Sequence, residues 1–110
     1  MTDDTLAALA ALIKSRRTAV ADTSYTRQLL DGGAMRCAKK FGEEAVEAVI
    51  AATSETPAAL TAEAADVVYH LLVLQESRGV AWADVVSELA KRTAQSGLAE
   101  KAARAATAKP

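Results

Sequence analysis

Apolar residues recur along the chain every three to four positions, the period that is typical of amphipathic α-helices. Near the N-terminus, Leu6, Leu9 and Ile13 share one helical stripe, and Thr2 or Asp3 is placed to cap that helix. Glycine, proline and polar clusters interrupt the period and divide the chain into segments. The pattern therefore predicts an all-α helical bundle of about four to five helices, covering residues 3–16, 24–31, 34–53, 57–78 and 81–94.

Particular residues mark the ends of these helices. Thr23 or Ser24 is placed to cap the second helix, which we expect to stop at Gly32-Gly33. Pro57 suits the first turn of the fourth helix, and Gly79 suits the position just after its end. The fifth helix is expected to pack inward through Val85, Val86 and Leu89, and the Ala/Lys-rich segment from about residue 95 is expected to be a loose helix or a frayed tail.

Composition favours one small domain, residues 1–110, that assembles with a second copy. Alanine occupies 27 of 110 positions and aromatic residues are scarce, so each helix buries little area. Net charge is −1 with acids and bases interspersed, which excludes the basic footprint of a nucleic-acid-binding protein. The apolar run 6–13 is too short to cross a membrane, and a single cysteine, Cys37, fits a reducing compartment as a buried structural thiol. We expect a cytoplasmic homodimer that binds neither nucleic acid nor a membrane.

The third predicted helix has two distinct sides. Its apolar side is expected to pack inward and consists of Met35, Ala38, Phe41, Ala45, Val46 and Val49. Its polar side carries Arg36 and Lys40, followed by Glu43, Glu44 and Glu47. Spacings of three and four residues place these three carboxylates on one face.

The fourth predicted helix is apolar all round between residues 65 and 74, except at Asp66 and His70. That pattern predicts a helix buried on most sides, in a run too short to span a membrane. Glu63, Asp66 and His70 nevertheless lie along one stripe, at i, i+3 and i+7. A carboxylate on such a helix requires a cation, a metal or a proton.

The short connector 53–57 predicts that these two helices are antiparallel neighbours, so four or five carboxylates converge. Like charges repel one another, and a hard divalent cation such as Mg²⁺ removes that repulsion. Magnesium typically sits between carboxylates and substrate phosphates, which favours phosphate chemistry. Alternatively, each acidic pattern is only a solvated face, with Lys40 paired to Glu44. A di-iron bundle would need Glu-x-x-His on paired helices, and the chain has one histidine.

These motifs resemble the all-α nucleoside triphosphate pyrophosphatases, which include MazG-type enzymes and dimeric dUTPases. More narrowly, the chain is similar to the phosphoribosyl-ATP pyrophosphatase family from about Leu6 to Ala102. The matching segments are Ser24-Tyr25-Thr26, Lys39-Lys40-Phe41-Gly42-Glu43-Glu44-Ala45-Val46-Glu47, Glu63-Ala64-Ala65-Asp66, Tyr69-His70-Leu71-Leu72-Val73-Leu74, and Ser96-Gly97-Leu98 with Glu100-Lys101.

The resemblance implies hydrolysis of phosphoribosyl-ATP to phosphoribosyl-AMP and pyrophosphate, the second step of histidine biosynthesis. It also implies a dimer and Mg²⁺ ligands at Glu44, Glu47, Glu63 and Asp66. Glu43 becomes a further ligand or the group that orients water, so Glu43 and Glu44 are the candidate catalytic residues.

Basic residues beside the carboxylates are candidates for substrate binding. Arg36, Lys39 and Lys40 could hold phosphates as positive charges. His70 is either a phosphate contact, a partner of the ligands or a hydrogen-bonded core residue. Tyr25 and Tyr69 either contact the adenine or ribose or pack inside the protein, and Trp82 is expected in the core or at a dimer interface.

Two other functions fit the same residues. A house-cleaning nucleoside triphosphate pyrophosphatase would share the metal site but would hydrolyse free nucleotides such as dUTP. A non-enzymatic helical interaction module would show no stabilisation by Mg²⁺ and no effect of substituting Glu63.

Overall fold

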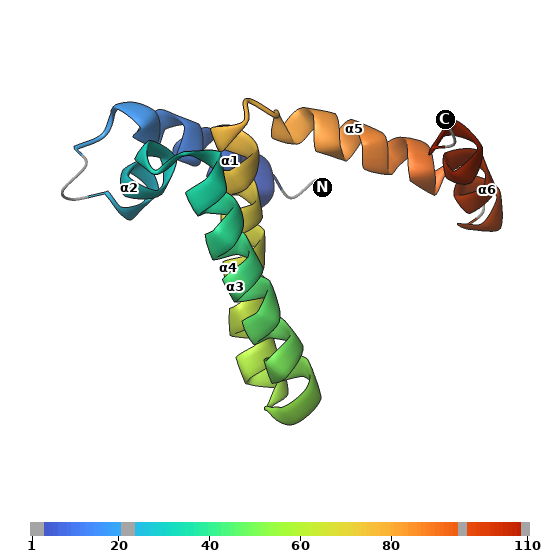
Figure 1. The fold of residues 1–110 in the computed structure, drawn as a ribbon, viewed down its shortest axis with the longest axis horizontal. Coiled ribbons are helices and arrows are strands. Elements are labelled where there is room, and N and C mark those ends of the chain that lie inside the picture. The colour runs from blue at the N-terminus through green and yellow to red at the C-terminus, as the bar shows by residue number, and fades with distance from the viewer. Residues whose placement is uncertain (1–3, 21–23, 95–96, 109–110) are drawn as a thin grey trace. The chain divides into compact units, whose positions relative to one another are not determined.

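The computed structural model describes residues 4–20, 24–94 and 97–108, and within these residues every regular element is a helix (Figure 1). The helices are α1 (Thr5–Ser15), the 3₁₀-helix η1 (Arg16–Thr18), α2 (Tyr25–Asp31), α3 (Gly33–Ser54), α4 (Pro57–Ser77), α5 (Trp82–Thr93) and α6 (Gly97–Ala108). They form two compact units, Met1–Val80 and Ala81–Pro110. The all-α prediction is confirmed, and α6 is the helical one of the two alternatives expected for the C-terminal segment.

The start of α2 has the cap that the sequence predicts, and the start of α4 has a cap, Thr56, that was not predicted. The Ser24 hydroxyl accepts a hydrogen bond from the Arg27 backbone N–H at 3.1 Å and caps α2. Thr56 caps α4 in the same way, accepting from the Ala59 N–H at 3.1 Å, with Pro57 as the first helical residue. The first helix differs, because Asp4 precedes it without a side-chain cap. Thr2, Asp3 and Thr23 lie outside the described residues.

The two adjacent glycines do not simply end α2. Gly32 ends α2 and begins α3 with an ordinary φ of −73°. Gly33 has a φ of 82°, which side chains with a Cβ rarely adopt, so the change of direction between the helices requires glycine there.

A Schellman motif ends α4 as its glycine predicts. Gly79 has a φ of 69°, and its N–H bonds to the Glu76 carbonyl at 3.1 Å. The Val80 N–H bonds to the Gln75 carbonyl at 2.9 Å.

An antiparallel hairpin of α3 and α4 forms the main body of the N-terminal unit (Figure 1). Helices α1 and α2 also contact α4, and the Arg17 guanidinium ties η1 to α4 through the Glu76 side chain and backbone carbonyl. Among the described residues the buried apolar side chains are Ile13, Leu29, Leu30, Cys37, Ala51, Leu72 and Val73. Cys37 is buried as expected; its Sγ–H donates to the Leu29 carbonyl at 3.2 Å, and burial raises the pKa of the thiol.

Several apolar side chains predicted to pack inward lie on the surface instead. On α3, Met35 is 88% exposed and Val49 is 62% exposed. On α5, Val86 and Leu89 are also exposed. The periodic pattern therefore identifies apolar faces correctly, but not all of them are covered within the described chain.

Helix α4 is longer than the apolar segment 65–74, which by itself is predicted to be too short to span a membrane. With 21 residues, it is long and apolar enough to cross a membrane by length and composition alone. Here it contacts α1, α2 and α3, but only His70, Leu72 and Val73 of its residues are buried, so the predicted burial on most sides is not found in the described chain.

Candidate active site

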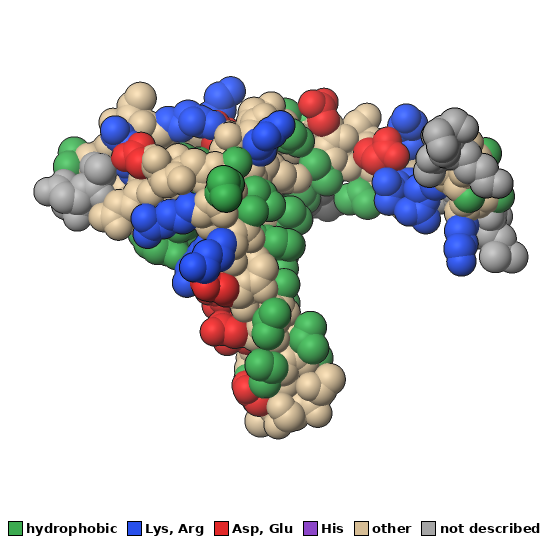
Figure 2. Space-filling view, in the orientation of Figure 1, with side chains coloured by type: hydrophobic (Ala, Val, Ile, Leu, Met, Phe, Trp, Pro, Cys, Tyr) green, Lys and Arg blue, Asp and Glu red, His purple; other side chains and the backbone are tan. Residues whose placement is uncertain are grey.

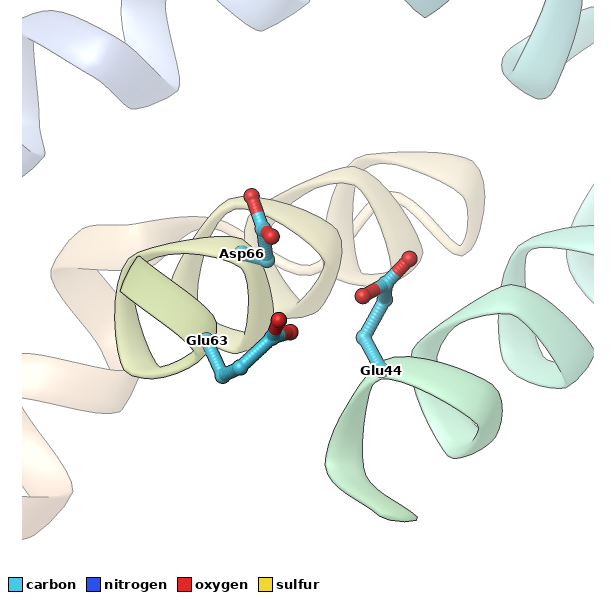
Figure 3. A group of neighbouring side chains, drawn as sticks. All are labelled: Glu44, Glu63 and Asp66. Carbon is cyan, nitrogen blue, oxygen red and sulfur yellow. The ribbon is translucent and has the colours of Figure 1, made fainter. Parts of the chain in front are cut away.

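Three predicted ligands, Glu44 from α3 and Glu63 and Asp66 from α4, form one acidic cluster (Figure 3). Each side chain offers a carboxylate oxygen, and these oxygens lie within 4.8 Å of one another. Glu44 and Glu63 are half-buried, and Asp66 is exposed. Pairing the helices antiparallel brings together residues that are about twenty positions apart, as the short connector predicts.

The acidic cluster has a donor set and a burial pattern that fit a divalent metal ion. Glu63 Oε2 is buried, and it has no hydrogen-bond partner among the described residues. A buried carboxylate oxygen without a partner is costly, and a cation would satisfy it. Three carboxylates that meet in one place also repel one another, and Mg²⁺ prefers such oxygen ligands.

The other two predicted acids flank the acidic cluster. Glu47 lines a pocket of about 260 Å³ with Ile50, Glu55 and Glu63. Glu43 lies near Glu44 through a shared partner, since its carboxylate is 3.7 Å from Lys40 Nζ. Glu55 is a residue that the sequence reasoning missed, because it stands in the connector; only its acidic character next to the hairpin turn could have indicated it.

A second pocket, here called the basic pocket, adjoins the acidic cluster along α3. It has a volume of about 400 Å³ and is lined by Tyr25, Leu29, Arg36, Lys39, Lys40 and Glu43. Figure 2 shows basic side chains next to acidic ones along the α3–α4 hairpin. The structure thus gathers all three predicted phosphate-binding cations in one place, and it adds Tyr25 from α2.

Lys40 connects the basic pocket to the acidic cluster. Its Nζ lies 3.6 Å from Glu44 Oε1, so the predicted pairing of these residues is present. The Tyr25 phenol, and after it the Glu44 and Glu43 carboxylates, raise the pKa of Lys40 above its ordinary value. Lys40 therefore stays positively charged well above neutral pH.

His70 belongs to α4 and is buried beside Tyr25 of α2. It does not line either pocket. Its Nδ1 lies 2.8 Å from the Asp66 backbone carbonyl, which can only accept, so Nδ1 carries the proton. The Tyr25 hydroxyl can then donate to Nε2, at 3.4 Å. Of the three roles expected for His70, this arrangement favours the hydrogen-bonded core residue, one that supports the turn carrying Asp66.

The two tyrosines dock the first turn of α2 on α4. The Tyr69 hydroxyl hydrogen-bonds to the Thr26 hydroxyl, and the Tyr25 and Tyr69 rings stack with centroids 6.5 Å apart. His70 meets the Tyr69 ring edge-on at 4.9 Å. Burial raises the pKa of Tyr69, so its phenol stays neutral. Tyr69 is a packing residue, whereas Tyr25 is 48% exposed beside the basic pocket.

The remaining residues singled out by the sequence lie in the C-terminal unit or outside the described residues. Trp82 begins α5 and is half-buried. Ser96 lies outside the described residues, and Gly97 begins α6.

Carboxylates from two antiparallel helices, beside a pocket lined by cations, are typical of an all-α, metal-dependent enzyme acting on phosphate groups. A model of the phosphoribosyl-ATP pyrophosphohydrolase family matches residues 6–93. The chain belongs to this family.

Curated relatives extend the similarity to most of the chain. A phosphoribosyl-ATP pyrophosphatase of Methylobacterium radiotolerans is 57% identical over 104 residues, 94% of this chain and 97% of the relative. Phosphoribosyl-ATP pyrophosphatase 1 of Bradyrhizobium diazoefficiens is 56% identical over 96 residues, 87% of this chain and 91% of the relative. The corresponding protein of Rhodopseudomonas palustris is 53% identical over 100 residues, 91% of this chain and 94% of the relative. The resemblance inferred from the motifs is confirmed.

Proposed function

We propose that this chain hydrolyses phosphoribosyl-ATP to phosphoribosyl-AMP and pyrophosphate, with Mg²⁺ held by Glu44, Glu63 and Asp66. Family membership and the named relatives support the substrate, the hydrolase class and the place in histidine biosynthesis. The observation that carries the metal site is the meeting of three carboxylates within 4.8 Å, one with a buried, unpartnered oxygen. Glu47 is the proposed fourth ligand, since it shares a pocket with Glu63.

The reaction breaks one phosphoanhydride bond. The oxygen of water adds to a phosphorus of the bridge between the first and second phosphates, and the bridging P–O bond breaks to release pyrophosphate. When bound, Mg²⁺ would neutralise the negative charge that develops on the phosphate oxygens. Glu43 is the proposed base that accepts a proton from water, because it flanks the ligands and its carboxylate is exposed.

Lys40 is proposed to hold the triphosphate next to the metal ligands. In the absence of substrate its ammonium is shared by Glu43 and Glu44. Phosphate oxygens entering the basic pocket can replace these carboxylates as its partners. The raised pKa of Lys40 keeps the positive charge in place throughout the neutral range.

A homodimer in the cytoplasm is the proposed assembly and location. Met35, Val46 and Val49 leave an apolar surface on α3 that a second copy would cover. The core of each unit is small, so burial between two chains would add stability that one chain lacks.

One assay separates this proposal from its rivals. Pyrophosphate release is measured with phosphoribosyl-ATP, ATP, dUTP and dCTP, each with and without Mg²⁺. The proposal predicts Mg²⁺-dependent turnover of phosphoribosyl-ATP in clear preference to the others. Faster hydrolysis of a free nucleotide would instead identify a house-cleaning pyrophosphatase, and no turnover with any substrate would favour an interaction module.

A further inference from the structure

The basic pocket extends away from the acidic cluster along α3. Lys40 lies one helical turn before Glu44, and Arg36 lies one turn further, which places their backbones about 6 Å and 12 Å from that of Glu44. Lys40 already pairs with the carboxylates at the near end. Within the described residues, Arg36 and Lys39 form no ion pair. Two cations that line the basic pocket, Arg36 one turn beyond Lys40 and Lys39 next to Lys40 in the sequence, are therefore available to an anionic ligand.

Gly32 leaves the space that the Arg36 side chain occupies where it lines the basic pocket. A Cβ on Gly32 would clash with Arg36 Cδ and lie 3.1 Å from Arg36 Cβ, so the Arg36 side chain runs directly across this glycine. The φ of Gly32 is −73°, which any residue adopts. Glycine at position 32 is thus explained by the space that the arginine occupies rather than by backbone conformation.

Phosphoribosyl-ATP has two ribose groups on its adenine ring. One carries the triphosphate, and the other, on N1, carries a single phosphate that is remote from the triphosphate. An ordinary nucleoside triphosphate has no such group. A dianionic phosphate is recognised by guanidinium and ammonium groups, and a base can stack on an exposed aromatic ring. From Glu44 toward Arg36 the site presents the acidic cluster, Lys40 with Tyr25, and then Arg36, with Lys39 as a second cation in the same pocket lining. This order matches the order of triphosphate, nucleoside and phosphoribosyl phosphate along the substrate.

We propose that Arg36 and Lys39 form a subsite for the phosphoribosyl phosphate, separate from the triphosphate site, and so select this substrate over ordinary nucleotides. The inference rests on the proposed function for its choice of ligand. Gly32 acts as a positioning residue, because it leaves room for the Arg36 side chain to lie toward the subsite.

The first test pairs two substrates with two variants. Pyrophosphate release is measured on phosphoribosyl-ATP and on N1-ribosyl-ATP, which lacks only the second phosphate. Lys39→Met and Arg36→Met are each expected to raise KM for phosphoribosyl-ATP roughly tenfold or more, while changing KM for N1-ribosyl-ATP less than about twofold. Lys14→Met removes an exposed charge from α1, outside the basic pocket, and is expected to change neither value. Equal increases in KM for both substrates would show that these cations bind the triphosphate. Unchanged KM values would show that they do not bind the substrate. Either result overturns the proposal.

A second test is independent of catalysis. Ribose 5-phosphate is titrated calorimetrically into the full chain and into Glu63→Gln, without Mg²⁺. Binding to both proteins, and at least about tenfold weaker binding to Lys39→Met, Arg36→Met and Gly32→Ala, supports the subsite. Ribose 5-phosphate that does not bind the wild-type protein, or binds Lys39→Met equally well, contradicts it. If the wild-type protein binds ribose 5-phosphate but does not hydrolyse phosphoribosyl-ATP, the proposed function fails while the phosphate subsite stands.

Discussion

The N-terminal unit and helix α5 of the C-terminal unit have similar sequence patterns but very different burial. The seven buried apolar side chains among the described residues all belong to the N-terminal unit. Helix α5 has a clear apolar side, yet none of its residues is buried, and Val86 and Leu89 are 45% and 49% exposed. Periodicity thus shows which side of a helix is apolar, and it does not show what covers that side.

The two regions also differ in the functional residues that they carry. Every residue of the acidic cluster and of the basic pocket lies in the N-terminal unit, between Tyr25 and Asp66. We therefore predict that substitutions in the two regions have separable effects.

The largest effect is expected from Glu63→Gln, which removes one charge from the acidic cluster and keeps the side chain's size. Turnover of phosphoribosyl-ATP should fall about a thousandfold, equivalent to roughly 4 kcal/mol of transition-state stabilisation. The metal-free variant should melt at or above the wild-type temperature, because one repelling charge is gone. Steady-state kinetics and thermal denaturation measure both effects, and wild-type turnover would remove Glu63 from the site.

A double substitution in α5, Val86→Asp with Leu89→Asp, tests the other region. If a second copy covers this apolar side, two buried charges should dissociate the dimer and lower its melting temperature by several degrees. Ser87→Asp places a charge on the same helix at a polar position and serves as the control. Sedimentation analysis that shows an unchanged dimer in the double variant would exclude this face as the interface.

The turn that begins α3 is expected to show a smaller effect. Gly33→Ala should destabilise the N-terminal unit by about 1–2 kcal/mol, because the φ of 82° is unfavourable for any residue with a Cβ. Gly42→Ala is the matched control in the interior of the same helix, where a Cβ would meet no atom within 4 Å. It should stabilise the protein by about 0.5–1 kcal/mol through helix propensity. Urea unfolding measures both changes, and equal effects would contradict a special role for Gly33.

The smallest effect concerns the docking of α2 on α4. Burial raises the pKa of Tyr69 above its ordinary 10.0, so this group stabilises the folded state below pH 10 and loses that contribution as pH rises through the folded-state pKa. Tyr69→Phe should be less stable than wild type at pH 8 by about 1 kcal/mol, because the hydrogen bond to Thr26 is lost. That difference should shrink above pH 10 in urea unfolding experiments. A constant difference would show that Tyr69 ionises without penalty.

Much of the fold could be predicted from sequence because its signals are local. Ser24, Pro57 and Gly79 mark helix ends through their own hydrogen bonds and backbone angles, and the structure confirms each. Helix α6 corresponds to the helical one of the two alternatives predicted for the C-terminal segment, and its alanines favour helix.

The site could be predicted from the sequence to the extent that the short connector between α3 and α4 determines how these helices pair. A short link makes α3 and α4 antiparallel, and Glu44, Glu63 and Asp66 then meet. The pocket shared by Glu47, Glu55 and Glu63 depends on how the end of α3 and the connector pack, which helical spacing does not specify. The contribution of Tyr25 to the basic pocket depends on α2 docking against α4, a tertiary contact with no local signal.

A crystal structure grown with Mn²⁺ in place of Mg²⁺ tests the central claim most directly, because an anomalous difference map locates the ion without assumptions about activity. We predict a peak within direct bonding distance of the Glu44, Glu63 and Asp66 carboxylates, absent from crystals of Glu63→Gln. A map in which these carboxylates point apart, or in which Mn²⁺ binds elsewhere on the chain, would contradict the proposed metal site.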